Sequence, residues 1–486
     1  MMNIKHILIA SALMVTWGSY GQSNLTMYNF NALPQTLHTN PAYPQQATFW
    51  IGLPVASRID VQYQNTGFKL ADLLADREGE IGDLTGDNVY DINDNIDDII
   101  ANLDDKSQFA FSSSFDLINI GFKTKKGFVT IGANQQVDYL MDYPADLMRL
   151  LWNGNQQFVG NEFTMREFDF ETIARTNFYL GYQRRFLNDK LILGTRLKYI
   201  LGQANAYVER FNLTNAQPNN ATWDISSDVL IRTGGLGTLT DARAEVTDFA
   251  FSSNTGFAVD LGAYYQVNDK LNVSASFLDW GSITWEEGTR DYMSEGQYTF
   301  NGLNVDFSDD DADPVQETLD SLESALNISD EGGNSYKRNL IQQFYASANY
   351  ELTEKHAFGL MYHARFWDGT MLHDVGVNYV SRLSRMFQYT ASYSIVNGTK
   401  NNLGGGIQLK LGPLQIYVVS DNILGALTYD QLESTNLSAG INLTFIESRK
   451  KIKARKEAEK KKAEEIKKNN QQEQQEKKQE EEAEKK

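Results

Sequence analysis

The chain has 486 residues with 8 prolines and no cysteine, and 12% of its residues are aromatic. Without cysteine it has no disulfide, thiol nucleophile or thiolate metal site. The net charge of −19 argues against nucleic acid as a partner. No apolar run after the N-terminus reaches the roughly 18 residues that a membrane-spanning helix needs.

Residues 1–21 have the pattern of a secretory signal peptide. Lys5 precedes an apolar core from Ile7 to Val15, and small residues stand at Ser19 and Gly21. We therefore expect an exported protein. Residues 22–56 are predicted to be an N-terminal lead-in or plug, because the stretch from Leu33 to Pro44 is interrupted by proline too often for long regular structure.

Residues 57–446 repeat the alternation of apolar and polar residues that is typical of β-strands. In the clearest segment, Asn436 to Phe445, every second side chain is apolar, and about ten such residues cross a bilayer as a tilted strand. One segment alone would also fit a soluble sandwich. The predicted strands are 57–66, 107–122, 126–139, 174–186, 190–200, 254–267, 270–279, 336–351, 354–367, 370–381, 384–396, 400–410, 412–420 and 434–446.

The connections between these segments alternate in length. Short turns, such as Asn188 to Lys190 and Asn268 to Lys270, separate four long excursions at 67–106, 140–173, 201–253 and 280–335. Outer-membrane barrels have short periplasmic turns, longer outer loops and an even number of strands. The pattern predicts an all-β fold, a transmembrane antiparallel β-barrel of about 14 strands (range 12 to 16) in the outer membrane of a Gram-negative bacterium, with both termini periplasmic. Segments 47–54 and 221–251 are the candidates for extra strands.

The long excursions are acidic and have helical spacing in places. We expect short helices at 70–75, 92–103, 144–152 and 314–326. Clustered carboxylates suit hard cations such as calcium, and the alternative is a solvated acidic surface. The weak calcium candidates are Asp83, Asp87, Asp91, Asp94, Asp309 and Asp311. No other cofactor is expected.

Residues 447–486 form a charged tail that is either helical or disordered. From Arg449 onward it contains 15 Lys and Arg against 10 Glu, with few apolar residues to build a core. In the predicted topology the tail is periplasmic, where peptidoglycan or a periplasmic protein is its candidate partner.

Enzymatic activity is not predicted, because the five histidines match no catalytic or metal-binding spacing. Strand parity instead directs seven charged or titratable side chains into the lumen. Their mixed signs indicate pairing and filling of the interior and not a wide channel of one sign. This predicted polar network consists of Arg196, Lys198, Asp260, His363, Arg365, Asp374 and Lys410.

Several stretches resemble a known group of proteins: Gly256 to Trp285, 191–202, 143–155, the N-P-A at 40–42 and the S-D-N-I-L-G at 420–425. In combination they resemble a domain-of-unknown-function family of predicted outer-membrane barrels. That family is similar to the PorP/SprF barrels of type IX secretion and gliding, and more distantly to PorV and FadL-like barrels. The resemblance implies a monomeric barrel in contact with outer-membrane lipid.

Two functions follow from this interpretation. The first is a structural or docking component of a cell-envelope assembly, with envelope or secretion proteins as partners. The alternative is a FadL-like conduit for a hydrophobic or small solute.

Overall fold

The computed structural model describes residues 24–68, 100, 103, 105–153, 158–219, 222–235, 252–301, 321–367, 369–396, 399–423 and 434–446. The predicted signal peptide, the charged tail and all six calcium candidates lie outside these ranges. Within them, no helix is both long enough and apolar enough to span a membrane.

The strands close into an antiparallel ring, which confirms the predicted 14-stranded barrel. The ring is completed by β2, because Ile59 pairs with Phe115 of β3 on one side and with Ala439 of β20 on the other. In ring order the strands are β2 (Ile59–Asn65), β3 (Lys106–Lys123), β4 (Gly127–Pro144), β6 (Asp169–Phe186), β7 (Leu191–Asn219), β9 (Thr255–Gln266), β10 (Leu271–Trp285), β14 (Gln342–Glu351), β15 (His356–Trp367), β16 (Thr370–Ser381), β17 (Phe387–Val396), β18 (Thr399–Leu411), β19 (Leu414–Ser420) and β20 (Ser434–Phe445).

The two extra segments form strands that add nothing to the ring. β1 (Phe49–Gly52) occupies the same place as β2 between β3 and β20, nearer one end of the barrel. β8 (Thr222–Gly234) pairs with the distal half of β7 and with β11 (Arg290–Phe300). The short strand β13 (Tyr336–Asn339) precedes β14 and pairs with β10.

Where the structure describes the excursions at 201–253 and 280–335, they are mostly strands and not loops, which corrects the prediction everywhere except at the candidate strand in 221–251. β7 runs on to Asn219, and its distal half forms a sheet with β5 (Glu162–Thr164), β8, β11 and β12 (Ser329–Gly332). We call this sheet the extension. In β8 the alternation continues, with Ile225, Val229 and Ile231 on the face opposite Asp224 and Asp228.

Short helices account for part of the remaining chain. α5 (Ala145–Asn153) confirms the helix predicted at 144–152, and residues 321–325 are helical within the segment predicted at 314–326. The helix predicted at 70–75, and most of that predicted at 92–103, lie outside the described residues. Near the N-terminus lie α2 (Leu25–Tyr28) and the 3-10 helix η2 (Pro34–His38).

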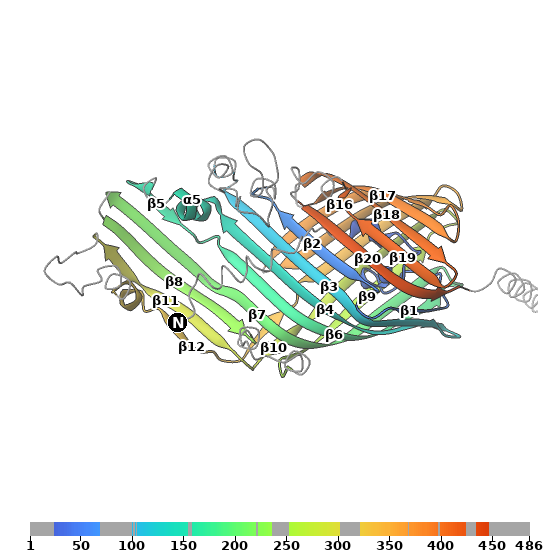
Figure 1. Ribbon diagram of the computed structural model, residues 1–486, viewed down its shortest axis with the longest axis horizontal. Helices are drawn as coiled ribbons and strands as arrows, with labels where there is room; N and C mark the ends of the chain where they lie inside the picture. Colours follow the sequence, from blue (N-terminus) through green and yellow to red (C-terminus); the bar gives the residue numbers. More distant parts are fainter. Residues whose placement is uncertain are drawn as a thin grey trace, which may run out of the picture.

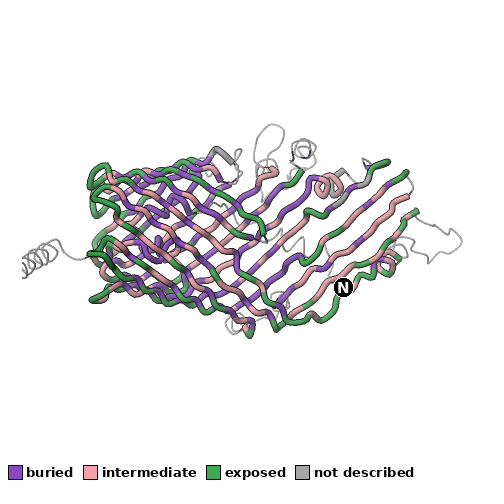
Figure 2. Tube along the Cα trace, turned by 180° about the vertical axis from the view of Figure 1, so that it is seen from behind, coloured by how far each residue is buried: buried purple, intermediate pink, exposed green. Residues whose placement is uncertain are grey.

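The barrel is apolar outside and polar inside. Outward-facing side chains include Phe257, which is 70% exposed, and Leu360, which is 61% exposed, whereas the inward-facing Asp260 and Asp374 are fully buried. Burial alternates along much of the ring, for example in β16 and β17 (Figure 2). This is the reverse of a water-soluble protein and matches a barrel whose outer surface contacts lipid.

The two ends of the molecule differ. At one end, which we call the short-turn end, β1 meets the last residues of β20 (Figure 1). The extension projects from the other end, here called the long-loop end, where β5, β8 and β11 lie beyond the ring. No large hydrophobic side chain of β8 or β11, both described in full, is among the exposed ones. The apolar outer surface therefore stops where the extension begins.

Candidate functional site

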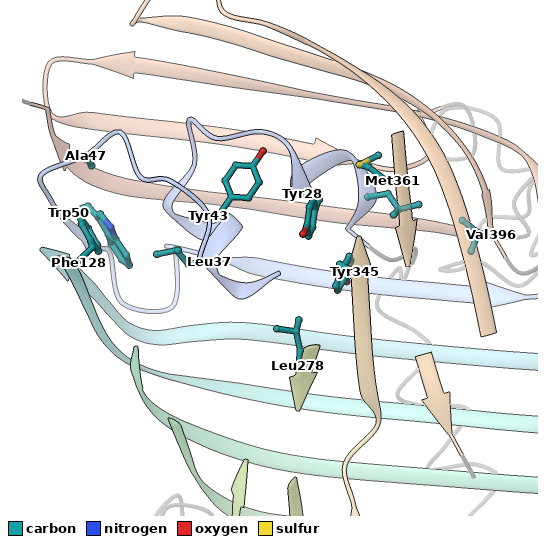
Figure 3. Packing of buried hydrophobic residues seen from close by; sticks show 11 residues of the cluster. Tyr28, Leu37, Tyr43, Ala47, Trp50, Phe128, Leu278, Tyr345, Met361 and Val396 are labelled. Atoms are coloured by element: carbon teal, nitrogen blue, oxygen red, sulfur yellow. The ribbon is translucent and has the colours of Figure 1, made fainter. Parts of the chain in front are cut away.

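The lumen of the ring is occupied by residues 24–48, which we call the lumen segment. Its apolar side chains are buried against the barrel wall, among them Tyr28 and Leu37 (Figure 3). The ring of Tyr28 stacks on Tyr345 of β14 with centroids 5.2 Å apart, and Tyr43 meets Tyr28 edge-on at 5.8 Å. Aromatic pairs in these arrangements add to the stabilisation that burial alone gives.

Asp421, directly after β19, binds the first turn of α2. Its carboxylate accepts backbone N–H groups from Leu25 at 3.1 Å and from Thr26 at 2.7 Å. These amide groups have no partner within the helix, and an anion is favoured at a helix N-terminus. The aspartate of the S-D-N-I-L-G stretch therefore fixes the start of the lumen segment to the barrel wall.

Asn40, from the N-P-A stretch, fixes the other half of the segment. Its Nδ2 donates to the Tyr28 hydroxyl at 2.9 Å, and its Oδ1 accepts the backbone N–H of Ala42 at 2.8 Å. The wall opposite is glycine because a Cβ on Gly262 would overlap Asn40 and lie 2.9 Å from the Ala42 nitrogen. Gln35 and Asn442 of β20 exchange two further hydrogen bonds, at 2.8 and 3.1 Å.

A cluster of buried ions lies beside the segment. Lys198 Nζ is 2.8 Å from Asp260 and 2.7 Å from Asp279. Arg175 Nη1 is 2.6 Å from Asp138, and its Nη2 is 3.7 Å from Asp279. These side chains come from β4, β6, β7, β9 and β10, and their charges alternate in space. Each buried charge thus has a compensating neighbour, as burial requires.

A β-bulge delivers Asp279 to this cluster. The pairing of β10 with β9 shifts between Phe277 and Trp280, and Asp279 adopts a positive φ of 59°. Its backbone N–H donates to Asp260 Oδ1 at 2.9 Å. As a result both Leu278 and Asp279 are buried while Trp280 is 59% exposed on the outer face.

His38 connects the segment to the ion cluster. Its Nε2 lies 3.5 Å from Asp116 of β3, and Arg196 donates to the carbonyl of the neighbouring Leu37. Burial lowers the pKa of His38 to about 3, against the opposing effect of Asp116. The imidazole is therefore neutral at physiological pH. Arg196 Nη1 lies 3.4 Å from Nδ1 and can only donate, so Nε2 carries the proton and directs it to Asp116.

Nearer the long-loop end, side chains from opposite walls meet across the lumen. Arg338 of β13 forms a two-pronged ion pair with Glu171 of β6, at 2.8 and 3.0 Å, and lies 4.3 Å over the ring of Tyr207. The indole of Trp367 donates to the same Glu171 at 3.0 Å. Because β6 is not adjacent to β13 or β15 in the ring, these contacts join the two walls. We call Glu171, Arg338 and Trp367 the cross-lumen layer.

Between the cross-lumen layer and the lumen segment lies a cavity of about 80 Å³. Its lining is mostly polar and includes Asn24 and His38 from the segment, with Leu140 and Ile341 on the side of the cross-lumen layer. Such a volume holds several water molecules. The lumen is thus obstructed on both sides of a small polar chamber.

The predicted network residues do not form a single network. Arg196, Lys198 and Asp260 meet in the ion cluster. His363 and Asp374 form a fully buried pair of their own, with Nδ1 2.7 Å from the carboxylate. Arg365 lines the same chamber as Arg196 and Lys198 but donates to Gln64 at 3.0 Å. Lys410, at the short-turn end, donates to the Thr444 carbonyl at 2.6 Å.

Sequence reasoning missed more of the site than it found. Asp116 and Asp138 lie in predicted strands with inward parity, so the alternation pattern contained that signal. The bulge turns Asp279 inward against the alternation of β10, so strand parity predicts the wrong side for it. No local pattern identifies Asp421 as a partner of the N-terminal helix. In the described part of the chain, no group of three or more His, Asp or Glu side chains is arranged to hold a metal ion.

A family model matches residues 41–421, described as a family of unknown function, DUF5723. The chain belongs to this family. The resemblance to a domain-of-unknown-function family is thereby confirmed, while the similarity to PorP/SprF barrels stays a prediction. No curated protein matches the chain.

Solved structures give distant likenesses. The toluene transporter TbuX of Ralstonia pickettii is 10% identical, with 88% of this chain and 99% of that one covered and a TM-score of 0.41. A Pseudomonas aeruginosa FadL homologue is 11% identical, with 88% and 97% covered and a TM-score of 0.41. The NalP translocator domain of Neisseria meningitidis is 8% identical, with 85% and 93% covered and a TM-score of 0.32. The fold described above rests on the strand pairings of the chain itself.

Two groups that hold the lumen segment should give opposite pH dependences. The pKa of His38 is lowered by burial to about 3, so its contribution to stability is lost as pH falls below the ordinary 6.5. Burial raises the pKa of Asp421 to about 6, so its contribution is largest below 3.8 and is lost as pH rises through 6. We expect that acidification from pH 6 to pH 4 stabilises H38Q, which keeps Asp421, and destabilises D421N, which keeps His38. The free energy of unfolding should change by about 1 kcal/mol per pH unit in each variant.

The measurement is the denaturant midpoint of each refolded variant at several pH values in that range. The wild-type curve should lie between the two, because the contributions of His38 and Asp421 oppose each other there. Parallel curves for H38Q, D421N and the wild type would contradict the assignment.

Proposed function

We propose that this protein is a barrel of the bacterial outer membrane, with the short-turn end toward the periplasm. The reversal of polarity across the barrel wall supports this, since exposed apolar side chains cover the ring and end at the extension. The sorting of short turns to one end supports the orientation. Both termini of the mature chain are periplasmic in this proposal.

Leu360, at the middle of β15, provides the test of the membrane assignment. It is 61% exposed on the outer face, so an arginine there would have to enter the hydrocarbon layer. We expect L360R to cost about 2–4 kcal/mol when the barrel refolds into lipid vesicles, measured by urea titration. The matched control is Q297R on the extension, which should leave the stability unchanged. Equal effects of the two substitutions would exclude a lipid-facing ring.

We further propose that the barrel is a structural or docking component of a cell-envelope assembly, with type IX secretion or gliding as the candidate process. The observation that carries this proposal is the extension, which presents a sheet outside the apolar belt. The occupied lumen supports it too, because a barrel filled by its own chain is better suited to presenting a surface than to free diffusion. The tail at 447–486 would offer a second contact, with peptidoglycan or a periplasmic protein.

A shortened hairpin tests the docking proposal. Residues 213–227 would be replaced by Asn-Gly, a turn that suits a two-residue hairpin and preserves the pairing of Asn212 with Asp228. We expect the shortened barrel to reach the membrane and to retain the slow gel mobility of a folded barrel, but not to restore secretion or surface display to a deletion strain. Full restoration would rule out the extension as a docking surface.

The second candidate function, a conduit for a solute, is favoured by the chamber inside the lumen. The lining is polar and charged, which suits a small hydrophilic solute better than a hydrophobic one. A specific nutrient defect in the deletion strain, with normal secretion, would favour this function over docking.

A further inference from the structure

The chamber contains buried polar atoms that no group of the protein satisfies. Asp60 and Asn177 are each 1% exposed, yet Asp60 Oδ2 and Asn177 Oδ1 accept no hydrogen bond. Both residues line the chamber, as does Arg196, whose Nε donates to nothing. Unsatisfied polar atoms at this depth destabilise the fold unless water or a ligand binds them.

Arg365 is the cation of the chamber that has no carboxylate partner among the described residues. The other three cations of the lining each have a carboxylate within 4.0 Å: Arg58 has Asp60, Arg196 has Asp260, and Lys198 has Asp260 and Asp279. Arg365 instead donates one hydrogen bond to the neutral amide of Gln64, and its Nε has no partner. A guanidinium in this state is suited to bind a carboxylate through two parallel hydrogen bonds.

The free groups therefore call for opposite chemistry within one small space. Arg365 requires an acceptor of negative charge, and Asp60 Oδ2 requires a donor, best a positively charged one. A simple anion would satisfy the first and repel Asp60, and a simple cation would do the reverse. A solute that carries both charges satisfies both groups and adds no net charge to a buried site.

We propose that the chamber is a binding site for a small amino acid, with its carboxylate at Arg365 and its ammonium group at Asp60. Asn177 Oδ1 is available for a second ammonium hydrogen bond. The volume of about 80 Å³ restricts the solute to a short carbon chain between the two charged groups. The site goes beyond the docking function and does not depend on it.

Calorimetry on the refolded full chain tests the site. The probes are glycine, β-alanine and γ-aminobutyrate, which place the two charges at increasing separation, with acetate and methylammonium as single-charge controls. We expect one of the three amino acids to bind at least about tenfold more tightly than either control, a difference of about 1.4 kcal/mol. Binding of acetate as tight as that of the best amino acid would overturn the proposal, as would the absence of binding by all three.

Variants assign the two ends of the solute. R365Q should weaken the best amino acid by about tenfold or more, because its two-pronged contact is lost. R365K keeps the charge and should bind with intermediate affinity. D60N should weaken the binding of the amino acid and of methylammonium, because the ammonium contact is lost. The binding of acetate should become tighter, because Asp60 no longer repels it. The control R210Q changes an arginine paired with Asp228 on the extension and should bind as the wild type does. If D60N does not fold, the arginine series still decides, because unchanged affinity in R365Q contradicts the proposal.

Discussion

Removing residues 24–48 and replacing Arg338 with alanine in one chain is expected to open the barrel into an ion-conducting pore. The reason is that two obstructions lie in series, the lumen segment and the cross-lumen layer, so either single change leaves the other in place. The double variant should conduct about tenfold better than either single variant in a planar bilayer. The wild type should give no steady channel.

The control is Q46A, which changes an exposed side chain of the segment without touching the wall. If the deletion prevents folding, D421A and N40A together take its place, because they remove two anchors of the segment. They are then combined with the replacement of Arg338. A large, steady conductance in the wild type, or none in the folded double variant, would contradict the two-obstruction arrangement.

Replacing Asp260 with alanine is expected to produce the largest loss of stability of any single charge change described here. Asp260 is fully buried and lies 2.8 Å from Lys198 and 3.6 Å from Arg196, so its removal leaves two buried cations with less compensation. Breaking a buried pair in this way costs about 3–5 kcal/mol. The loss should appear as a lower urea midpoint for the barrel refolded in vesicles.

The matched control is D228A. Asp228 also pairs with an arginine, at 3.0 Å from Arg210, but both side chains are close to half exposed. Exposed pairs of this kind contribute about 0–1 kcal/mol. A D260A barrel as stable as D228A would show that the ion cluster contributes nothing to holding the wall together.

The ring could be predicted from the sequence because its signal is local. Each predicted strand alternates on its own, and strand parity alone placed Arg196, Lys198 and Asp260 on the inner face. Of the extension, only the strand in 221–251 was a candidate, where Ile225, Val229 and Ile231 alternate in the same way. The rest was expected to be loop, because the long-loop pattern of known barrels outweighed the local evidence.

The rest of the site depends on contacts between distant parts of the chain. A bulge in the pairing of β10 with β9 reverses parity after Phe277. The position of the lumen segment likewise depends on contacts with Asp421, Asn442 and Gly262, which are all far from it in sequence. Alternation within single strands contains no information about such partners.

The hydrogen bond from Leu25 to Asp421 joins residues 396 positions apart, and β2 meets β20 only when the circle is complete. Contacts of such high sequence separation form late, since the intervening chain must be ordered first. The residues of α2, at the start of the lumen segment, are therefore among the last to reach their places. Until the final hairpin is made, the nascent barrel has an unfilled, water-accessible interior and two unpaired edges, which is the stage at which an assembly factor would have to protect it.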